Sequence, residues 1–397
     1  MATSSTASGG SATSAITLLA VASFASQSMV RVSDSLLPQI STDMGVSVGA
    51  ASIVVTAYAF AHGSVQLVIG PVGDRFGKYA CIIAACAAAS VLVLLCGLAT
   101  SLPMLVAARL ACGLAAGWII PLAFAFLGDV IPYERRQQVL GTFLSGQILG
   151  QLFGQAAGGI IGDYFGWRVT FFALAAMLAI AAIALAHELA TNPVTRVARD
   201  APKGPGMIAS YKAVLGNPWA RVMLVAVGVE GTFFQGVFSY IGADLHLRFG
   251  LSFTAIGIII GIFAIGGLVY AATVRPLMRR LGQVRIANAG GVAMGLAFMT
   301  LAVEPVWYFA PLATLCVGLG FYMLHNTLQT EATQMVPEAR GTSVALFASV
   351  YFLGQTTGVA LGAPVMDRFG AQPLFVISAL VLPALAFWFT RRLKRKG

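Results

Sequence analysis

Residues 79–98 read YACIIAACAAASVLVLLCGL, which is twenty consecutive positions without a charged side chain. An α-helix of about 20 apolar residues is long enough to cross the roughly 30 Å hydrocarbon core of a bilayer. The stretch therefore predicts a membrane-spanning helix.

The same pattern recurs along the whole chain of 397 residues. By the same length rule we expect twelve spans, at residues 15–38, 49–70, 79–98, 104–127, 139–161, 169–189, 220–241, 252–274, 286–304, 308–328, 342–364 and 373–390. Because the connections between these spans are short, little sequence remains for a separate soluble domain.

The composition excludes several other classes of protein. Apolar residues make up 58% of the chain and charged residues only 10%, against roughly 25% charged in a soluble domain. So few charges cannot cover a water-facing surface, which argues against a soluble enzyme, a nucleic-acid-binding protein and a disordered chain. The five cysteines show no metal-ligand spacing, and we expect no metal or other cofactor beyond a proton gradient.

The basic residues predict the orientation of the chain. Most of the 24 Lys and Arg residues flank one set of span ends, whereas only Arg168, Arg248 and Arg368 flank the other set. Since positive charges gather on the cytoplasmic side, we expect both termini there. The predicted location is a multi-pass protein of the bacterial cytoplasmic (inner) membrane.

The chain also contains an internal repeat. Residues 149–151 (LGQ) and Asp163 recur 204 positions later as residues 353–355 (LGQ) and Asp367. Two six-span halves with the same topology are the parallel-repeat architecture of transporters, in which substrate binds between halves that rock. The predicted fold is thus an all-α integral membrane protein whose twelve transmembrane helices form two pseudo-symmetric six-helix bundles.

The polar stretch around residues 191–212 places the boundary between the two halves. We assign residues 1–190 to an N-terminal six-helix bundle, 191–216 to a cytoplasmic linker and 217–397 to a C-terminal six-helix bundle.

Three motifs carry a family resemblance. Residues 70–78, GPVGDRFGK, resemble the signature loop of the major facilitator superfamily. Residues 109–113, RLACG, are similar to its second motif, with Cys112 in place of a frequent glutamine. Residues 150–159 resemble the helix-five motif of its twelve-helix bacterial drug/proton antiporter (efflux permease) branch, although Gln155 stands where that motif has proline.

The resemblance assigns a role to the loop after the second span. It implies a latch that holds the two halves together in the outward-facing state. We expect the Asp74 carboxylate to accept hydrogen bonds from the start of the span at 342–364, and Lys78 to pair with Asp129. The alternative is a solvated loop whose positive charges only set topology. The predicted latch residues are Gly70, Asp74, Arg75, Gly77, Lys78 and Asp129.

Charges within the spans indicate a proton-coupling site. A charged residue costs about 2.5–3.5 kcal/mol at the centre of a membrane helix, so it needs a role there. Arg31 and Asp34 share a face of the first span, and Arg109 in the fourth span lies at a similar depth to Asp34. We therefore predict an Asp34–Arg109 ion pair with Arg31 nearby, whose opening switches proton uptake. The alternative is a static ion pair that fixes helix packing.

Glu230 is the second candidate for proton coupling. It lies near the middle of its span, which contains no basic residue, so we expect it to be an unpaired proton or cation site. The alternative is a carboxyl group that stays protonated. His62 and His325 are weaker candidates, because a lone histidine in a span more often bonds a neighbouring carbonyl.

Polar and aromatic residues suggest a cavity, and glycines suggest a packing seam. Gly150, Gly154 and Gly158 recur every four residues, which allows another helix backbone to approach closely. The neighbouring glutamines either line the substrate path or bridge helices. The predicted cavity residues are His62, Gln147, Gln151, Phe234, Phe238, His325, Asn326 and Gln355.

These features favour a secondary active transporter. We expect proton-coupled export of a small organic compound or drug by rocker-switch alternating access. A proton-coupled uptake symporter or a uniporter for a small metabolite is the alternative. A polytopic membrane enzyme or a receptor is disfavoured, because the sequence has no catalytic cluster, nucleotide-binding loop or effector domain. The expected partners are the lipid bilayer, protons and a small-molecule substrate, not nucleic acid, and the chain is expected to act as a monomer.

Overall fold

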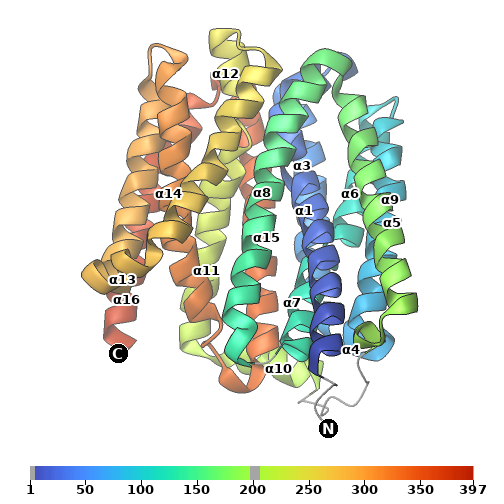
Figure 1. Cartoon of the computed structure of the whole chain (residues 1–397). Helices are drawn as coiled ribbons and strands as arrows, with labels where there is room; N and C mark the ends of the chain where they lie inside the picture. Colours follow the sequence, from blue (N-terminus) through green and yellow to red (C-terminus); the bar gives the residue numbers. More distant parts are fainter. Residues whose placement is uncertain (1–4, 132, 197–205, 397) are drawn as a thin grey trace.

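Long apolar helices run from one end of the molecule to the other (Figure 1). A computed structural model describes residues 5–131, 133–196 and 206–396, and this part of the chain contains helices and no strand. The first half of the chain forms α1 (Ser5–Met44), α2 (Val48–Ala51), α3 (Ile53–Val65), α4 (Ile69–Phe76), α5 (Lys78–Gly97), α6 (Leu102–Ala116), α7 (Ile119–Val130), α8 (Tyr133–Phe165) and α9 (Trp167–Thr191). The second half forms α11 (Pro218–Glu230), η2 (Gly231–Gly236), α12 (Ile241–Phe249), α13 (Phe253–Val303), η3 (Trp307–Phe309), α14 (Ala310–Ala332), η4 (Pro337–Ala339), α15 (Arg340–Phe369) and α16 (Gln372–Lys396). Between them lie η1 (Pro193–Arg196) and α10 (Met207–Gly216).

These helices account for the twelve predicted spans. Ten stretches of the described chain are long and apolar enough to cross a membrane. One of them, α13, has 51 residues and holds two predicted spans, because Gly282 (φ 72°) breaks its helical backbone. The predicted span at 139–161 lies in α8. The predicted all-α membrane fold is therefore confirmed.

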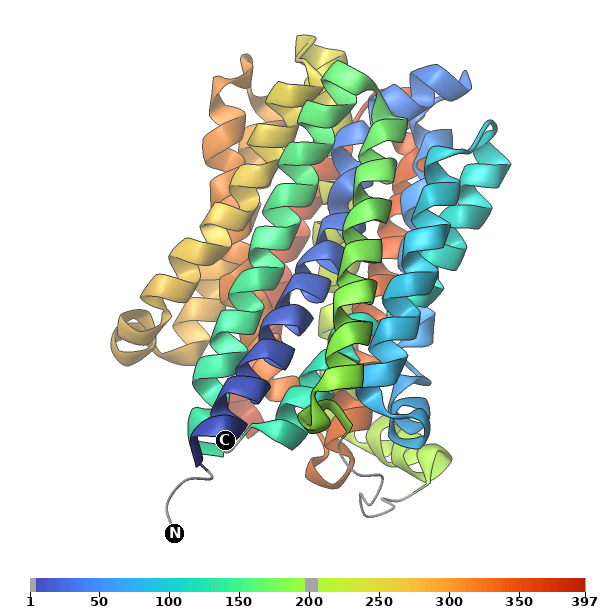
Figure 2. The same cartoon turned by 45° about the vertical axis from the view of Figure 1, so that its right-hand side comes forward.

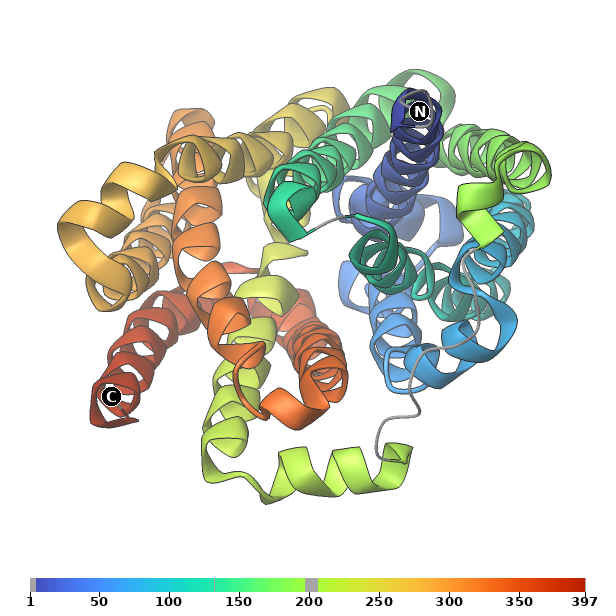
Figure 3. The same ribbon diagram turned by 60° about the horizontal axis from the view of Figure 1, so that its bottom comes forward.

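The helices gather into two groups. Viewed from the end that carries the termini, α1–α9 lie on one side and α11–α16 on the other, and α10 runs across the front edge between them (Figure 3). The first half of α13 packs beside α8 of the other group (Figure 2). The exact residue boundaries proposed for the two bundles and the linker stay a prediction.

The backbone repeats between the two groups. All glycines with positive φ in the described chain form three pairs, and the members of each pair lie 204 or 205 residues apart: Gly45 and Gly250, Gly77 and Gly282, Gly166 and Gly370. Only glycine adopts such a conformation without strain, so each pair marks the same turn in both halves. The sequence repeat is thus also a repeat of chain geometry.

The glycine seam lies where α8 crosses α1. A Cβ atom on Gly154 would come within 2.2 Å of the Ser28 carbonyl oxygen, and one on Gly150 within 2.5 Å of the Phe24 carbonyl oxygen. A Cβ atom on Gly158, further along the same line, would come within 3.0 Å of the Ser35 hydroxyl oxygen. The two helix backbones therefore touch along this seam.

Candidate functional site

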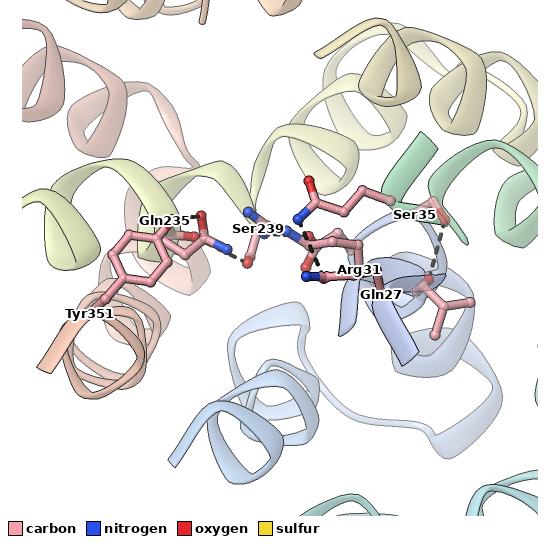
Figure 4. A network of polar contacts seen from close by, with 9 residues as sticks. Gln27, Arg31, Ser35, Gln235, Ser239 and Tyr351 are labelled. Atoms are coloured by element: carbon pink, nitrogen blue, oxygen red, sulfur yellow. Dashed lines mark hydrogen bonds and ion pairs between the residues drawn. The ribbon is translucent and has the colours of Figure 1, made fainter. Parts of the chain in front are cut away.

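The centre of the molecule holds a buried ion pair on α1. The Arg31 guanidinium donates to the Asp34 carboxylate at 2.8 Å, and both side chains are fully buried. The guanidinium also lies 5.0 Å from the centre of the Phe238 ring, while Asp34 accepts a hydrogen bond from the Ser239 hydroxyl. The pair therefore joins the N-terminal half to the broken span formed by α11, η2 and α12 (Figure 4).

This arrangement corrects the predicted Asp34–Arg109 pair. Among the ion pairs of the described residues, Asp34 pairs with Arg31, and Arg109 instead donates to the Met29 carbonyl at 3.4 Å. Its guanidinium lies 4.2 Å from the centre of the Tyr58 ring. Arg31, one turn away on the same helix, takes its place.

Glu230 and His325 form the second buried pair. His325 Nδ1 lies 2.7 Å from Glu230 Oε2, and the Glu230 side chain is completely buried. This contact corrects two expectations: Glu230 is not unpaired, and His325 bonds a carboxylate rather than a carbonyl. The partner comes from α14, almost a hundred residues away along the chain, so no pattern within either span indicates the contact.

The backbone changes its winding directly after Glu230. Residue 230 ends α11, and residues 231–236 continue as a π-helical turn. Such turns insert an extra residue and frequently occur at functional sites. A Cβ atom on Gly231 would come within 2.3 Å of the Tyr351 carbonyl oxygen, so the turn packs directly on α15.

A row of polar side chains connects the two halves through this turn. The Tyr351 hydroxyl donates to Gln235 Oε1 at 2.6 Å, and the Ser239 hydroxyl oxygen lies 3.4 Å from the Gln235 backbone carbonyl oxygen. Figure 4 shows the row continuing from Ser239 to Arg31. Sequence reasoning missed Tyr351, Ser239 and Gln235, because such polar residues are common in apolar spans; only the closeness of Gln235 to Glu230 in the sequence could have pointed to it.

Aromatic rings surround the second pair. Phe234 stacks on Phe321 with 4.4 Å between ring centres, and the His325 ring lies 4.7 Å from the same Phe321 ring. Phe238 packs at 5.0 Å against Phe263. Phe234 and Phe238, predicted to line a cavity, are fully buried in this cluster.

Two of the predicted cavity glutamines bridge helices. Gln147 and Gln151 of α8 both contact Gln27 of α1, at 3.5 Å and 3.4 Å. Their position shows contact between helices, whereas their part in a substrate path stays a prediction.

The remaining predicted cavity residues lie in different surroundings. His62 is buried between the Tyr58 ring and the Phe352 ring of the other half, 4.4 Å from the latter. Gln355 is buried on α15, and Asn326 hydrogen-bonds Tyr270. The structure therefore brings His325 to Glu230 and leaves His62, Gln355 and Asn326 in separate contacts.

The predicted latch is described only in part. Lys78 Nζ lies 2.5 Å from Asp129 Oδ2, a partly exposed contact within the N-terminal half. Gly77 has a φ of 89°, and the Arg75 guanidinium lies over the Phe76 ring. The side-chain environments of Gly70 and Asp74 lie outside the described residues, so the contact of Asp74 with the other half stays a prediction.

Carboxylates clamp the two halves together at the opposite end, where α8 ends and α13 begins (Figure 1). Asp367 accepts hydrogen bonds from the Ser47 hydroxyl at 2.7 Å and from the Gly49 amide at 2.8 Å. Its repeat counterpart Asp163 accepts one from the Thr254 amide at 3.2 Å. Each carboxylate thus holds the start of a span in the other half.

Known proteins resemble the chain over nearly its whole length. A sequence profile described as Major Facilitator Superfamily matches residues 18–359. The uncharacterized MFS-type transporter YceJ of Bacillus subtilis is 24% identical over 87% of this chain and 88% of its own. A probable sugar efflux transporter of Pasteurella multocida is 23% identical over 89% of this chain and 87% of its own. The crystal structure of a bacterial homolog of the human lysosomal transporter Spinster shares the fold, with a TM-score of 0.75 at 18% identity over 98% of each chain.

Proposed function

This chain belongs to the Major Facilitator Superfamily of membrane transporters, and we propose that it couples export of a small organic compound to proton entry. The observation that supports coupling is the buried Glu230–His325 contact. A carboxyl group and an imidazole in direct contact can pass a proton from one to the other, and both are side chains that commonly carry protons in transporters. In this proposal the Arg31–Asp34 pair has a structural role: it holds α1 against the span formed by α11, η2 and α12, beside the Glu230–His325 contact.

Proton entry supplies enough energy for this task. One elementary charge moving across the membrane releases about 2.3 kcal/mol per 100 mV. That corresponds to a concentration ratio of about 50 for a compound exported with a stoichiometry of one. No metal or other cofactor is needed, and we propose transport rather than enzymatic catalysis.

The two clamps support alternating access. In this proposal the clamped end faces the outside of the cell, both termini lie in the cytoplasm, and the described state is closed outwards. Opening requires the Asp163 and Asp367 contacts to break while the latch around Asp74 closes the other end. The proposed setting is a monomer in the bacterial cytoplasmic membrane, with the bilayer, protons and substrate as its partners and without nucleic acid.

The test begins with a substrate. Purified protein is screened for thermal stabilisation by sugars, nucleosides, amino acids and the cationic dye ethidium, and each compound that stabilises it is followed in proteoliposomes with an imposed pH gradient. Glu230→Gln should abolish gradient-driven accumulation but retain exchange of labelled for unlabelled compound. Glu188→Gln, which alters a buried carboxylate hydrogen-bonded to Ser14 and Asn192, is the matched control and should retain both activities.

Each alternative has its own signature in this assay. Accumulation on the side from which protons enter, with the same Glu230 dependence, would indicate an uptake symporter. Flux that ignores the pH gradient in the unsubstituted protein would indicate a uniporter. Normal gradient-driven accumulation by Glu230→Gln would refute the proton assignment.

A further inference from the structure

A hollow lies between the beginning of α11 and the end of α16. It is a shallow depression, widely open to the surroundings, and it is lined by Pro218, Trp219, Val222, Arg392 and Arg395. It belongs neither to the central pairs nor to the clamps, and both helices that form its walls are candidate membrane spans.

The charge of this hollow is positive. Residues 372–397 contain five basic residues and no acidic one. Arg392 and Arg395 are exposed and lie three residues apart on α16, which puts them on one face of the helix. Among the ion pairs of the described residues, none involves either guanidinium.

The inner wall of the hollow is apolar. The Trp219 ring packs 6.1 Å from the Phe389 ring, and Val222 follows one turn further along α11. Val225 and Phe387, on the same two helices, are also exposed apolar side chains. Tryptophan is enriched where a membrane meets water, which is where the apolar part of α16 ends.

We propose that this hollow binds the phosphate group of an anionic phospholipid. Guanidinium groups bind phosphate oxygens through paired, charge-assisted hydrogen bonds, and basic pockets between membrane helices suit lipid headgroups. The apolar wall accommodates the upper part of the acyl chains, which a free phosphate ion lacks. The site is independent of the proposed transport reaction, because it contains no residue of the central pairs.

The test measures lipid binding directly. The full-length protein in a neutral detergent is titrated with phosphatidylglycerol, phosphatidylcholine and glycerol phosphate, and bound lipid is counted by native mass spectrometry. Because charge-assisted hydrogen bonds are lost, Arg392→Ala/Arg395→Ala should weaken phosphatidylglycerol binding by about 30-fold or more. Arg391→Ala/Lys394→Ala removes the same charge from the same exposed turn outside the hollow and should weaken it by less than about five-fold.

Three results would overturn the proposal. Equal losses in both double variants would mean diffuse attraction to a basic surface. Binding of glycerol phosphate as tight as that of phosphatidylglycerol would mean a soluble-anion site, and no loss in either variant would mean no site. If the alanine variant does not fold, Arg392→Lys/Arg395→Lys is the second variant, which keeps both positive charges but loses the planar guanidinium groups that bind phosphate through two hydrogen bonds. Its control is Arg391→Lys, outside the hollow. Weaker phosphatidylglycerol binding by the double lysine variant than by this control supports the proposal.

Discussion

In the N-terminal half, Gly154 of α8 lies against the Ser28 carbonyl of α1; in the C-terminal half, Gly358 of α15 lies against the Thr232 carbonyl of η2. Both contacts would put a Cβ atom within 2.2 Å of the oxygen, and the partners are related by the same offset of 204 residues. The three pairs of positive-φ glycines and the two carboxylate clamps follow the same repeat, with offsets of 204 or 205 residues. The backbone frame is therefore common to the two halves.

The buried charges break this symmetry. The N-terminal half contributes a permanently charged guanidinium bonded to Asp34, whereas the C-terminal half contributes Glu230 bonded to a histidine. An arginine keeps its charge at every physiological pH, but a histidine changes its charge between pH 5 and 8. On the proposed function, the repeated frame moves, the first half supplies a fixed charge and the second half exchanges the proton.

The largest expected effect comes from removing the acid of each pair. Asp34→Asn leaves the Arg31 guanidinium buried without a counter-charge and should lower the free energy of unfolding by about 3–5 kcal/mol. Glu230→Gln replaces the carboxylate that contacts His325 by an amide of the same shape, so the loss should be about 1 kcal/mol, that of an ordinary hydrogen bond. Thermal melting of the purified variants in one detergent compares the two.

A double variant serves as the control for this comparison. Arg31→Gln/Asp34→Asn should recover most of the lost stability, because neither residue then carries a charge. Equal losses for Asp34→Asn and Glu230→Gln would mean that His325 carries a fixed charge too, and the proposed contrast between the halves would fail.

The next effect tests the shared frame. Gly154→Ala and Gly358→Ala each force a methyl group against a backbone oxygen, and overpacking of this kind costs about 1–3 kcal/mol. We expect the two losses to be alike in melting experiments. Gly146→Ala is the matched control on α8: its methyl group would have 3.9 Å of space, and alanine favours a helix, so this variant should be neutral or more stable. Unequal losses at the two equivalent glycines would show that the seams are not interchangeable.

The sequence predicts the spans and the glycine seams better than the buried pairs at the centre of the molecule, for a physical reason. Spans and glycine seams arise from residues close together in the chain, so a pattern such as Gly150, Gly154 and Gly158 reveals them. The contact of Glu230 with His325 depends instead on how two distant helices rotate against each other. The predicted Asp34–Arg109 pair shows the same limit, because it was inferred from the positions of the span ends rather than from side-chain packing.

The smallest expected effect concerns the clamps. Asp367 accepts two hydrogen bonds and Asp163 only one, and both carboxylates are exposed to solvent, which weakens their contribution. Asp367→Ala should therefore loosen the clamped end more than Asp163→Ala, without a large change in melting temperature. Hydrogen–deuterium exchange can follow the amides that the carboxylates bind, those of Gly49 and Thr254.

The pattern of exchange decides whether the clamps act together. If the two halves rock as rigid bodies, removing either carboxylate should speed up exchange in both the segment around Gly49 and the segment around Thr254, with Asp367→Ala having the larger effect at both. If each substitution affects only its own segment, the clamps open independently. The repeated frame would then not move as a unit, and alternating access in this chain would require a local gate instead.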